Sequence, residues 1–300
     1  MIDMKEIGKL KIAVPDGHLW EGTIELLRRA GYSLRTEERL YDVILINDPD
    51  IVMKIKRPQN IPSPVEKGVY DLGLTGYDLI IESGSDVEEL ADLGYGRADI
   101  VVAAPKRYKV KTFDEFIKKV KGKTIWVGSE YPNITKKFLD SKLLPNDIKY
   151  TFELQYGKAE SFEGDLLIEN TETGYTLEIN DWQILYKIFS STARLIANKQ
   201  SLEDSWKKEK ISDFLTLIQG AQEGLNKRLL KMNVPEYALE GVISVLPALK
   251  KPTISKLYGK DGWVALESVV PTDQVVKLIP ELKKKGAEGI LETEIIKIIK

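Results

Sequence analysis

The chain has 300 residues, enough to bury the cores of two or three domains. Its 44 Lys and Arg residues nearly balance 46 Asp and Glu residues, and the net charge of −2 predicts neither nucleic acid nor a membrane surface as a partner. The absence of Cys and the presence of a single His, His18, exclude disulfides, thiolate sites and metal sites built from several histidines.

The N-terminal segment has no signal-peptide character. The apolar core of a signal peptide is missing from its sequence, MIDMKEIGKL. No apolar run approaches the ~20 residues that a helix needs to cross a bilayer. We therefore expect a globular, cytoplasmic protein.

Short apolar runs alternate with helical patterns over the first two thirds of the chain. In residues 20–30, Trp20, Ile24 and Leu27 fall on one face of a helix that Gly31 is suited to end. Thr112 and Glu115 have the spacing of a capping box before another helix. This alternation predicts an α/β fold with a largely parallel sheet. Strands are predicted at Lys11–Val14, Tyr41–Ile46, Val52–Lys56, Leu72–Thr75, Ile100–Ala104, Thr124–Val127 and Leu166–Ile168, while Pro62 and Pro64 interrupt the chain before Val65–Val69.

The rhythm changes in the last third of the chain. Residues 204–225 form a long helical pattern with Ile211, Phe214 and Ile218 on one stripe. The pattern that follows is β-α-β-β-α-β, which is typical of a ferredoxin-like unit. Its strands are predicted at Lys227–Asn233, Thr253–Tyr258, Trp263–Val270 and Ile290–Ile299, and its helices from Pro235 to about Leu249 and from Pro271 through Lys285.

The stretch Gly164–Leu177, GDLLIENTETGYTL, carries most of the candidate chemistry. A buried strand, Leu166–Ile168, is predicted to end in the polar residues Glu169 and Asn170, and the turn Thr171–Gly174 then leads into a helix. Hydroxyls, a glycine and unpaired N–H groups at a helix start favour a phosphate, and an acidic residue at the strand end can hold ribose hydroxyls or Mg²⁺. The same residues also fit an ordinary strand-turn-helix with a Thr cap.

Other polar segments also follow predicted strands. Tyr131–Thr135 precedes a helix over Lys136–Leu143, where Asn133 or Thr135 can cap the helix, or its N–H groups and Lys136 can meet a phosphate. The glycines of Leu72–Asp78 either admit a ligand to the backbone or serve the turn.

Two single residues of the first third have the same two interpretations. Arg57 is either a phosphate or carboxylate partner or a solvated surface residue. His18, in the loop after the first strand, is either a ligand contact or a structural residue.

Taken together, the chain resembles the long-form ATP phosphoribosyltransferase family over essentially its whole length. The resemblance rests on the order and spacing of PDGHLWEGTIELLRRAG, RPQNIPSPVEKGVYDLGLTGYDLI, DVEELADLGYGRADIVVAAP, EYPNITKKFL, TETGYTL with STARLIANK, and NVPEYALEGVISVLPALKKPTISKL. It implies two periplasmic-binding-protein-like α/β lobes with the active site between them, over residues 1–99 with 183–225 and over residues 100–182. It also implies a C-terminal ferredoxin-like domain, residues 226–300, that binds histidine as a feedback inhibitor.

The resemblance further implies the reaction. The phosphoribosyl group of phosphoribosyl diphosphate is transferred to N1 of ATP and diphosphate is released, with Mg²⁺ as cofactor, in the first step of histidine biosynthesis. Members of the family assemble as homodimers and hexamers. Such a reaction passes through an oxocarbenium-like state and needs positioning and charge stabilisation more than a covalent nucleophile.

Residue roles follow from the resemblance position by position. Glu169 and Asp165 match acidic residues of the phosphate-loop motif and are expected to be catalytic. Substrate binding is expected of Thr171, Glu172, Thr173, Gly174, Tyr175 and Thr176, with the 5′-phosphate on Thr173, Gly174 and Thr176, and of Gly17, His18, Arg57, Tyr131, Asn133 and Thr135. The inhibitor histidine is expected near Asn233, Thr253, Ser255 and Ala265.

The chain departs from the family pattern at several cationic positions. The family usually has Lys-Gly-Arg where Asp16-Gly17-His18 stands, basic residues at the positions of Tyr77 and Tyr175, and Asp at the position of Asn60. A charged hydrogen bond contributes ~1.5–3 kcal/mol, so phosphate binding weakens unless Lys158, Lys136 and His18 replace the charge. A weakened or inactive two-lobed ligand-binding relative is therefore one alternative. A transport receptor is another, which the missing secretion signal and the C-terminal domain disfavour.

Overall fold

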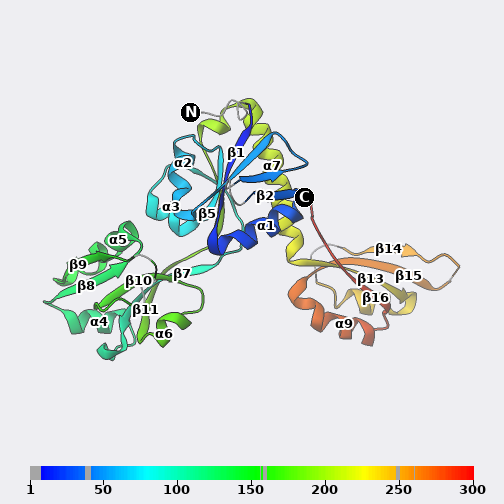
Figure 1. Ribbon diagram of the computed structural model, residues 1–300. Helices are drawn as coiled ribbons and strands as arrows, with labels where there is room; N and C mark the ends of the chain where they lie inside the picture. The colour runs from blue at the N-terminus through cyan, green and yellow to red at the C-terminus, as the bar shows by residue number, and fades with distance from the viewer. Residues whose placement is uncertain (1–7, 38–41, 156, 158–160, 248–250, 260) are drawn as a thin grey trace. The chain divides into compact units, whose positions relative to one another are not determined.

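The computed structural model describes residues 8–37, 42–155, 157, 161–247, 251–259 and 261–300 (Figure 1). The chain divides into two compact units: residues 1–24 with 33–211, and residues 25–32 with 212–300. The predicted residues Tyr41, Lys158 and Leu249 lie outside the described residues.

The first sheet runs through seven strands in the order β2 (Leu34–Glu37), β3 (Asp42–Leu45), β4 (Ile51–Lys56), β1 (Leu10–Pro15), β5 (Leu72–Gly76), β12 (Ala193–Ala197) and β6 (Glu88–Asp92). β1 lies between two parallel neighbours, β4 and β5, and the remaining ladders are antiparallel. The prediction of a largely parallel sheet is therefore wrong. Only short links join β2, β3 and β4, and a parallel pair needs a crossover of a dozen or more residues.

The second sheet has the order β11 (Trp182–Ser191), β7 (Ala98–Pro105), β10 (Leu166–Thr171), β8 (Thr124–Ser129) and β9 (Lys149–Leu154). β10 and β8 are parallel, as are β8 and β9, whereas β7 pairs antiparallel with β10 and β11. The chain passes between the two sheets through residues 93–97 and through Thr192. The resulting pair of α/β lobes confirms the predicted fold class for this part of the chain.

Helices cover the faces of both sheets. In the second lobe α4 (Phe113–Val120) and α5 (Pro132–Lys142) bury Phe116 and Leu139 against β7 and β10. The threonine cap of α4 is confirmed, because Thr112 Oγ1 accepts the N–H of Glu115 at 3.3 Å. The Glu115 carboxylate accepts the N–H of Lys111 at 2.7 Å, one residue before the N-cap residue of a complete capping box. The remaining helices of this unit are α1 (Trp20–Arg29), which starts in it, α2 (Pro62–Glu66), α3 (Tyr77–Ser83), α6 (Tyr175–Ile179) and the start of α7 (Ser205–Leu225).

Two local expectations are corrected in this unit. Pro62 and Pro64 do not interrupt the chain but open α2, because the first-turn N–H groups of a helix have no intrahelical partner that proline would remove. The buried strand predicted over Leu166–Ile168 is longer than expected, because β10 continues through Glu169 and Asn170 to Thr171.

The ferredoxin-like prediction is confirmed in the second unit. The sheet has the order β14 (Thr253–Lys256), β15 (Trp263–Pro271), β13 (Lys227–Pro235) and β16 (Glu288–Glu294), all antiparallel. One sheet face packs against α8 (Leu239–Ile243) and α9 (Val275–Lys284). The helix predicted from Pro235 is shorter than expected, since Pro235 ends β13 and α8 starts after a 3₁₀ turn, Glu236–Ala238.

The C-terminal segment leaves this sheet instead of extending the last strand. β16 ends before the predicted end of the strand at Ile299. The N–H of Ile298 instead donates to the carbonyl of Gly220 on α7 at 2.9 Å. A Cβ on Gly224, one turn further along α7, would lie 2.9 Å from the carbonyl oxygen of Ile295. Two glycines therefore let the last backbone segment approach the helix.

Among the helices of the described residues, none is both long enough and apolar enough to span a bilayer.

Candidate functional site

The turn after β10 is closed by its own hydroxyl groups. Thr171 Oγ1 accepts the N–H of Gly174 at 2.8 Å, and Thr173 Oγ1 accepts the N–H of Tyr175 at 3.3 Å. Gly174 has φ +78°, a left-handed conformation that favours glycine, and a Cβ there would lie 2.9 Å from Ile184 Cδ1. The turn is thus held in one shape before any ligand binds. α6 has only five residues, so its helix dipole is too short to be the main attraction for an anion.

A polar pocket of about 340 Å³ lies at this turn. The family-derived expectations converge here, because the pocket combines two carboxylates with three threonine hydroxyls. Gly174 and Tyr175 belong to the turn but do not line the pocket, and the side chain of Tyr175 is 66% exposed. The lining residues are Gly157, Glu169, Asn170, Thr171, Glu172, Thr173, Thr176 and Leu177.

Asp165 does not belong to this pocket. It precedes β10, and the strand carries the chain ~3.3 Å further per residue toward Glu169 and the turn. Its carboxylate accepts the Tyr108 hydroxyl at 2.5 Å and the N–H of Trp126 at 2.9 Å, and the guanidinium of Arg107 lies 3.5 Å away. Burial and this hydrogen bond raise the pKa of Tyr108 to about 12, so the phenol remains a donor. Asp165 therefore joins β8 to β10 away from the turn.

Tyr131 lies at the centre of a buried polar network. Its hydroxyl donates to Asp78 Oδ2 at 2.8 Å and accepts Asn170 Nδ2 at 2.6 Å. Asp78 Oδ1 accepts the Ser191 hydroxyl at 2.6 Å. Burial, and then the charge of Asp78, raise the pKa of Tyr131 well above its ordinary value. The network joins α3, the start of α5, β10 and β11, and Asn170 connects it to the pocket at the turn.

The start of α5 is already occupied by a carboxylate of the protein. Glu82 accepts the N–H groups of Asn133 and Ile134, both at 2.9 Å, and its carbonyl accepts Asn133 Nδ2 at 2.8 Å. The Thr135 hydroxyl is buried and has no hydrogen-bond partner among the described residues. Glu82 thus satisfies the helix start at which a phosphate was one expectation.

The first-lobe candidates lie at one edge of the first sheet. Pro15 and Lys56 are paired at the ends of the parallel strands β1 and β4, so Gly17 and His18 follow one strand where Arg57 follows the other. Gly17, with φ +64°, starts a 3₁₀ turn, and Gly17, His18 and Arg57 are exposed. This is the carboxyl edge of the parallel pair, where α/β sheets bind ligands.

Other basic side chains do not simply replace the lysines and arginines that the family pattern has and this chain lacks. The ring of Tyr77 packs against the guanidinium of Arg194 at 4.9 Å, but Arg194 is paired with Glu89 and Asp92. Lys136, one predicted substitute, is paired with Asp140 at 2.8 Å. Of the residues expected to replace that charge, Lys158 lies outside the described residues, and His18 is exposed in the turn that follows β1.

The four residues expected to bind histidine share one face of the ferredoxin-like sheet. Asn233 pairs with Ala265, which pairs with Ser255 on the next strand, and Thr253 lies two residues along on the same face. This face is opposite the one that α8 and α9 cover. The sheet therefore presents the four residues together.

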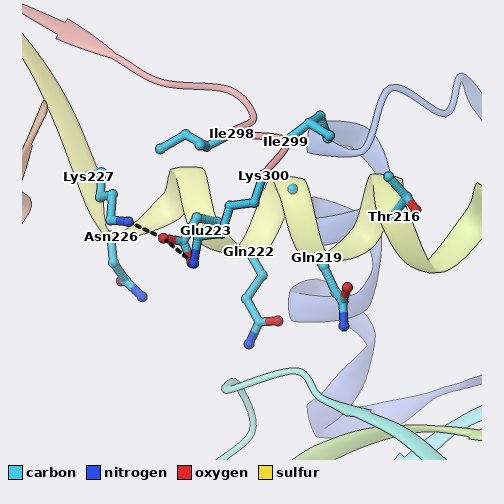
Figure 2. Close-up of a pocket in the computed structure, with 10 residues that line it drawn as sticks. Thr216, Gln219, Gln222, Glu223, Asn226, Lys227, Ile298, Ile299 and Lys300 are labelled. Atoms are coloured by element: carbon cyan, nitrogen blue, oxygen red, sulfur yellow. Dashed lines mark hydrogen bonds and ion pairs between the residues drawn. The ribbon is translucent and has the colours of Figure 1, made fainter. Parts of the chain in front are cut away.

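A larger pocket, of about 570 Å³, lies along α7 in the second unit (Figure 2). Glu223 is paired with Lys227 and with Lys300, the latter at 3.1 Å, and Gln219 and Gln222 extend from the same helix. None of the predicted site residues lines it. Both of its lysines, Lys227 and Lys300, pair with the single carboxylate of Glu223, and the expected substrate contacts lie elsewhere, so size alone does not make it the better candidate.

The metal-binding potential of the described residues is limited. No group of three or more His, Asp or Glu side chains among them could hold a metal ion by itself. Glu169 and Glu172, however, line the same pocket. A cation that also takes oxygen ligands from a bound substrate is compatible with this pair.

Sequence reasoning did not identify Asp78, Ser191, Asn170 or Glu82 as site residues. Asp78 belongs to the glycine turn Leu72–Asp78 that the sequence singled out, but its partners are 53 and 113 residues away. No local pattern connects residues so far apart in sequence.

Known proteins resemble this chain along its length. A family model described as "ATP phosphoribosyltransferase" matches residues 57–220, and one described as "HisG, C-terminal domain" matches residues 225–297. An ATP phosphoribosyltransferase of Chlorobium phaeovibrioides is 42% identical over 298 residues, 97% of each chain. One of Pelotomaculum thermopropionicum is 37% identical over 299 residues, 97% of this chain and 99% of that one. The solved "ATP phosphoribosyl transferase (HisG:HisZ) complex from Thermotoga maritima" matches with a TM-score of 0.59 and 26% identity, over 70% of this chain and 96% of that chain.

Proposed function

The chain belongs to the ATP phosphoribosyltransferase family, and we propose that it transfers the phosphoribosyl group of phosphoribosyl diphosphate to N1 of ATP, releasing diphosphate, in the first step of histidine biosynthesis. The observation that carries the proposal is the pocket at the end of β10, where carboxylates and hydroxyls meet in one cavity. Ribose hydroxyls suit the carboxylates, and phosphate oxygens suit the threonine hydroxyls. One pocket therefore accommodates both ends of a ribose phosphate.

The chemistry requires charge stabilisation rather than a covalent nucleophile. As the bond from C1 to diphosphate breaks, positive charge develops on the ribose ring, and the lone pair of ATP N1 forms the new bond. Glu169, at the end of β10, would stabilise that charge, while Thr173 and Thr176 would hold the 5′-phosphate on the turn that Gly174 shapes. The exposed edge with Gly17, His18 and Arg57 would take ATP or diphosphate groups.

Mg²⁺ is the cofactor we propose. Mg²⁺ is usually held by one or two carboxylates together with substrate phosphates. Glu169 and Glu172, which line the same pocket, would supply that donor set. Bound there with the substrate, the ion would neutralise charge on the leaving diphosphate.

The direct test is product formation. The full chain is incubated with ATP, phosphoribosyl diphosphate and Mg²⁺, and phosphoribosyl-ATP is measured by mass spectrometry. Calorimetric binding of phosphoribosyl diphosphate without any product above background would favour the non-catalytic alternative. If the chain neither binds phosphoribosyl diphosphate nor forms product, the proposed function is refuted.

Asp165 has a structural role in this proposal rather than the catalytic one that the resemblance implies. Asp165→Ala leaves the Tyr108 hydroxyl and the Trp126 N–H without their acceptor, so we expect a stability loss of ~2–4 kcal/mol by denaturant unfolding. At temperatures well below unfolding, kcat/KM should change less than ~threefold. Glu163→Ala, an exposed carboxylate two residues earlier, is the control and should alter neither quantity. A large fall in kcat with unchanged stability would restore the catalytic role.

Histidine is proposed to inhibit by binding the open face of the ferredoxin-like sheet. Ala265→Trp places a large ring between Asn233 and Ser255, so the histidine concentration for half inhibition should rise at least ~tenfold while uninhibited kcat is retained. Lys277→Trp, at an exposed position of α9 on the opposite side of the sheet, is the matched control. Normal inhibition of the Ala265 variant would place histidine elsewhere.

The assembly and location of the chain complete the proposal. We propose homodimers and hexamers, as the resemblance implies, in the cytoplasm, where both substrates are made. Analytical ultracentrifugation with and without histidine measures the assembly.

A further inference from the structure

Asn170 connects the pocket to the buried network of Tyr131. It is the second-to-last residue of β10, it is exposed, and it lines the pocket beside Glu169. Its side-chain amide reaches the Tyr131 hydroxyl at 2.6 Å. Asn170 is therefore accessible to a ligand on one side and held by the protein on the other.

The network determines which end of the amide faces Tyr131. The carboxylate of Asp78 accepts hydrogen bonds and cannot donate them, so the Tyr131 hydroxyl donates its one hydrogen bond to Asp78 Oδ2 at 2.8 Å. The Ser191 hydroxyl likewise donates to Asp78 Oδ1 at 2.6 Å, while it accepts the Asp78 N–H at 3.1 Å. Tyr131 oxygen can then only accept from Asn170, which places Nδ2 of the amide on that side.

The hydrogen bonds among Asn170, Tyr131 and Asp78 are shielded from water, and the Tyr131 phenol stays protonated. Tyr131 is 4% exposed and Asp78 is 9% exposed, so water does not compete for these bonds. Burial and the Asp78 charge keep the pKa of Tyr131 far above neutrality, and the phenol remains the donor throughout the neutral range. The orientation of the Asn170 amide is thus the same at any working pH.

The other arm of the amide is an acceptor without a protein partner. Because Oδ1 and Nδ2 are on different arms of a planar group, fixing Nδ2 on Tyr131 directs Oδ1 away from it. Within the described part of the chain, no donor is bonded to Asn170 Oδ1. The pocket therefore contains an oriented, neutral acceptor beside a carboxylate.

We propose that Asn170 is a specificity-determining residue of this pocket, which accepts a hydrogen bond from a hydroxyl of the bound pentose through Oδ1, and that Tyr131 and Asp78 are the positioning residues that orient it. The inference rests on the proposed function, since it assumes that a ribose phosphate occupies the pocket. The ligand class is a pentose phosphate with a free ring hydroxyl. A neutral acceptor recognises such a hydroxyl without adding negative charge near the diphosphate.

The test is the loss of discrimination between sugars. Binding of phosphoribosyl diphosphate and of its 2-deoxy and 3-deoxy analogues to the full chain is measured by calorimetry, with KM and kcat determined in parallel. For the unchanged chain, removing the recognised hydroxyl should weaken binding about tenfold. Asn170→Leu should bind that analogue and phosphoribosyl diphosphate equally, with KM for phosphoribosyl diphosphate raised about tenfold and KM for ATP unchanged.

Two further variants complete the design. Asn170→Ser shortens the side chain without adding apolar bulk and should lose the same discrimination, so the answer does not depend on whether the leucine variant folds. Tyr131→Phe keeps Asn170 but removes its anchor, so discrimination should fall, and adding Asn170→Leu to it should lower discrimination no further than Asn170→Leu alone.

The outcomes separate this inference from the proposed function. If the unchanged chain binds phosphoribosyl diphosphate and the leucine and serine variants discriminate between the sugars as it does, the role of Asn170 is overturned while the function stands. Weaker binding of all three sugars with an unchanged ratio also overturns it, because that is the result of a merely structural residue. No binding by the unchanged chain overturns the proposed function itself.

Discussion

Gly174→Val should reduce the affinity for phosphoribosyl diphosphate at least ~30-fold, because the valine cannot hold the backbone conformation that shapes the pocket. Gly174 has φ +78°, and its Cβ would lie 2.9 Å from Ile184 Cδ1. The side chain of Ile184 can move, but a β-branched residue at positive φ is strained whatever the space. The turn should therefore shift and break the hydrogen bond from Gly174 N–H to Thr171. Calorimetric titration with phosphoribosyl diphosphate measures the effect.

Gly122→Val separates backbone strain from ligand binding. Gly122 has φ +73°, close to that of Gly174, and a Cβ there would meet nothing within 4 Å. It lies in the turn before β8, outside the pocket. We expect it to lower the melting temperature about as much as Gly174→Val but to leave affinity unchanged. Unaltered binding by the Gly174 variant would show that the sugar phosphate does not use this turn.

The parts of the fold that follow from local chemistry could be predicted from the sequence. The threonine cap of α4 needs only Thr112 three residues before Glu115, and the structure confirms it. The β-α-β-β-α-β order of the second unit is likewise predicted by the spacing of its apolar residues and by its turn residues. Such signals do not depend on what the element later packs against.

The elements that sequence reasoning missed depend on distant partners. β6 (EELAD) is a polar edge strand that exists because β12, about a hundred residues later, pairs with it. Only Thr192 separates β11 from β12, so no glycine or proline marks the passage from one sheet to the other. The packing of the C-terminal segment on α7 also depends on distant residues. Gly220 and Gly224 leave room for the backbone of residues 295–299, a role that the helix sequence alone does not indicate.

The candidate site divides in the same way. The turn Thr171–Gly174 and its strand could be predicted, because glycine and hydroxyl residues after a buried run are a local signal. That Asp165 belongs to Tyr108 and Trp126, and that Glu82 occupies the start of α5, could not, because both depend on pairs that only the folded chain brings together. Family motifs identify positions, whereas geometry decides which of them share a pocket.

Glu169→Gln should lower kcat ~10²–10³-fold, equivalent to about 3–4 kcal/mol of transition-state stabilisation, with little change in KM for ATP. The amide keeps the size of the side chain but removes the negative charge that lies in the pocket at the end of β10. Positive charge on the ribose is larger in the transition state than in the substrate, so the loss should be concentrated in kcat. Steady-state kinetics with each substrate varied in turn measures it.

Glu178→Gln removes a charge of the same type from α6, outside the pocket, and should change kcat less than ~threefold. Both variants change the net charge of the lobe equally, so a difference between them reports the effect of the carboxylate's position in the pocket. Because a mere loss of long-range attraction is screened by salt, the effect at Glu169 should persist at high ionic strength. Equal losses in the two variants, or a loss at Glu169 that salt abolishes, would mean that the carboxylate does not face the reacting ribose.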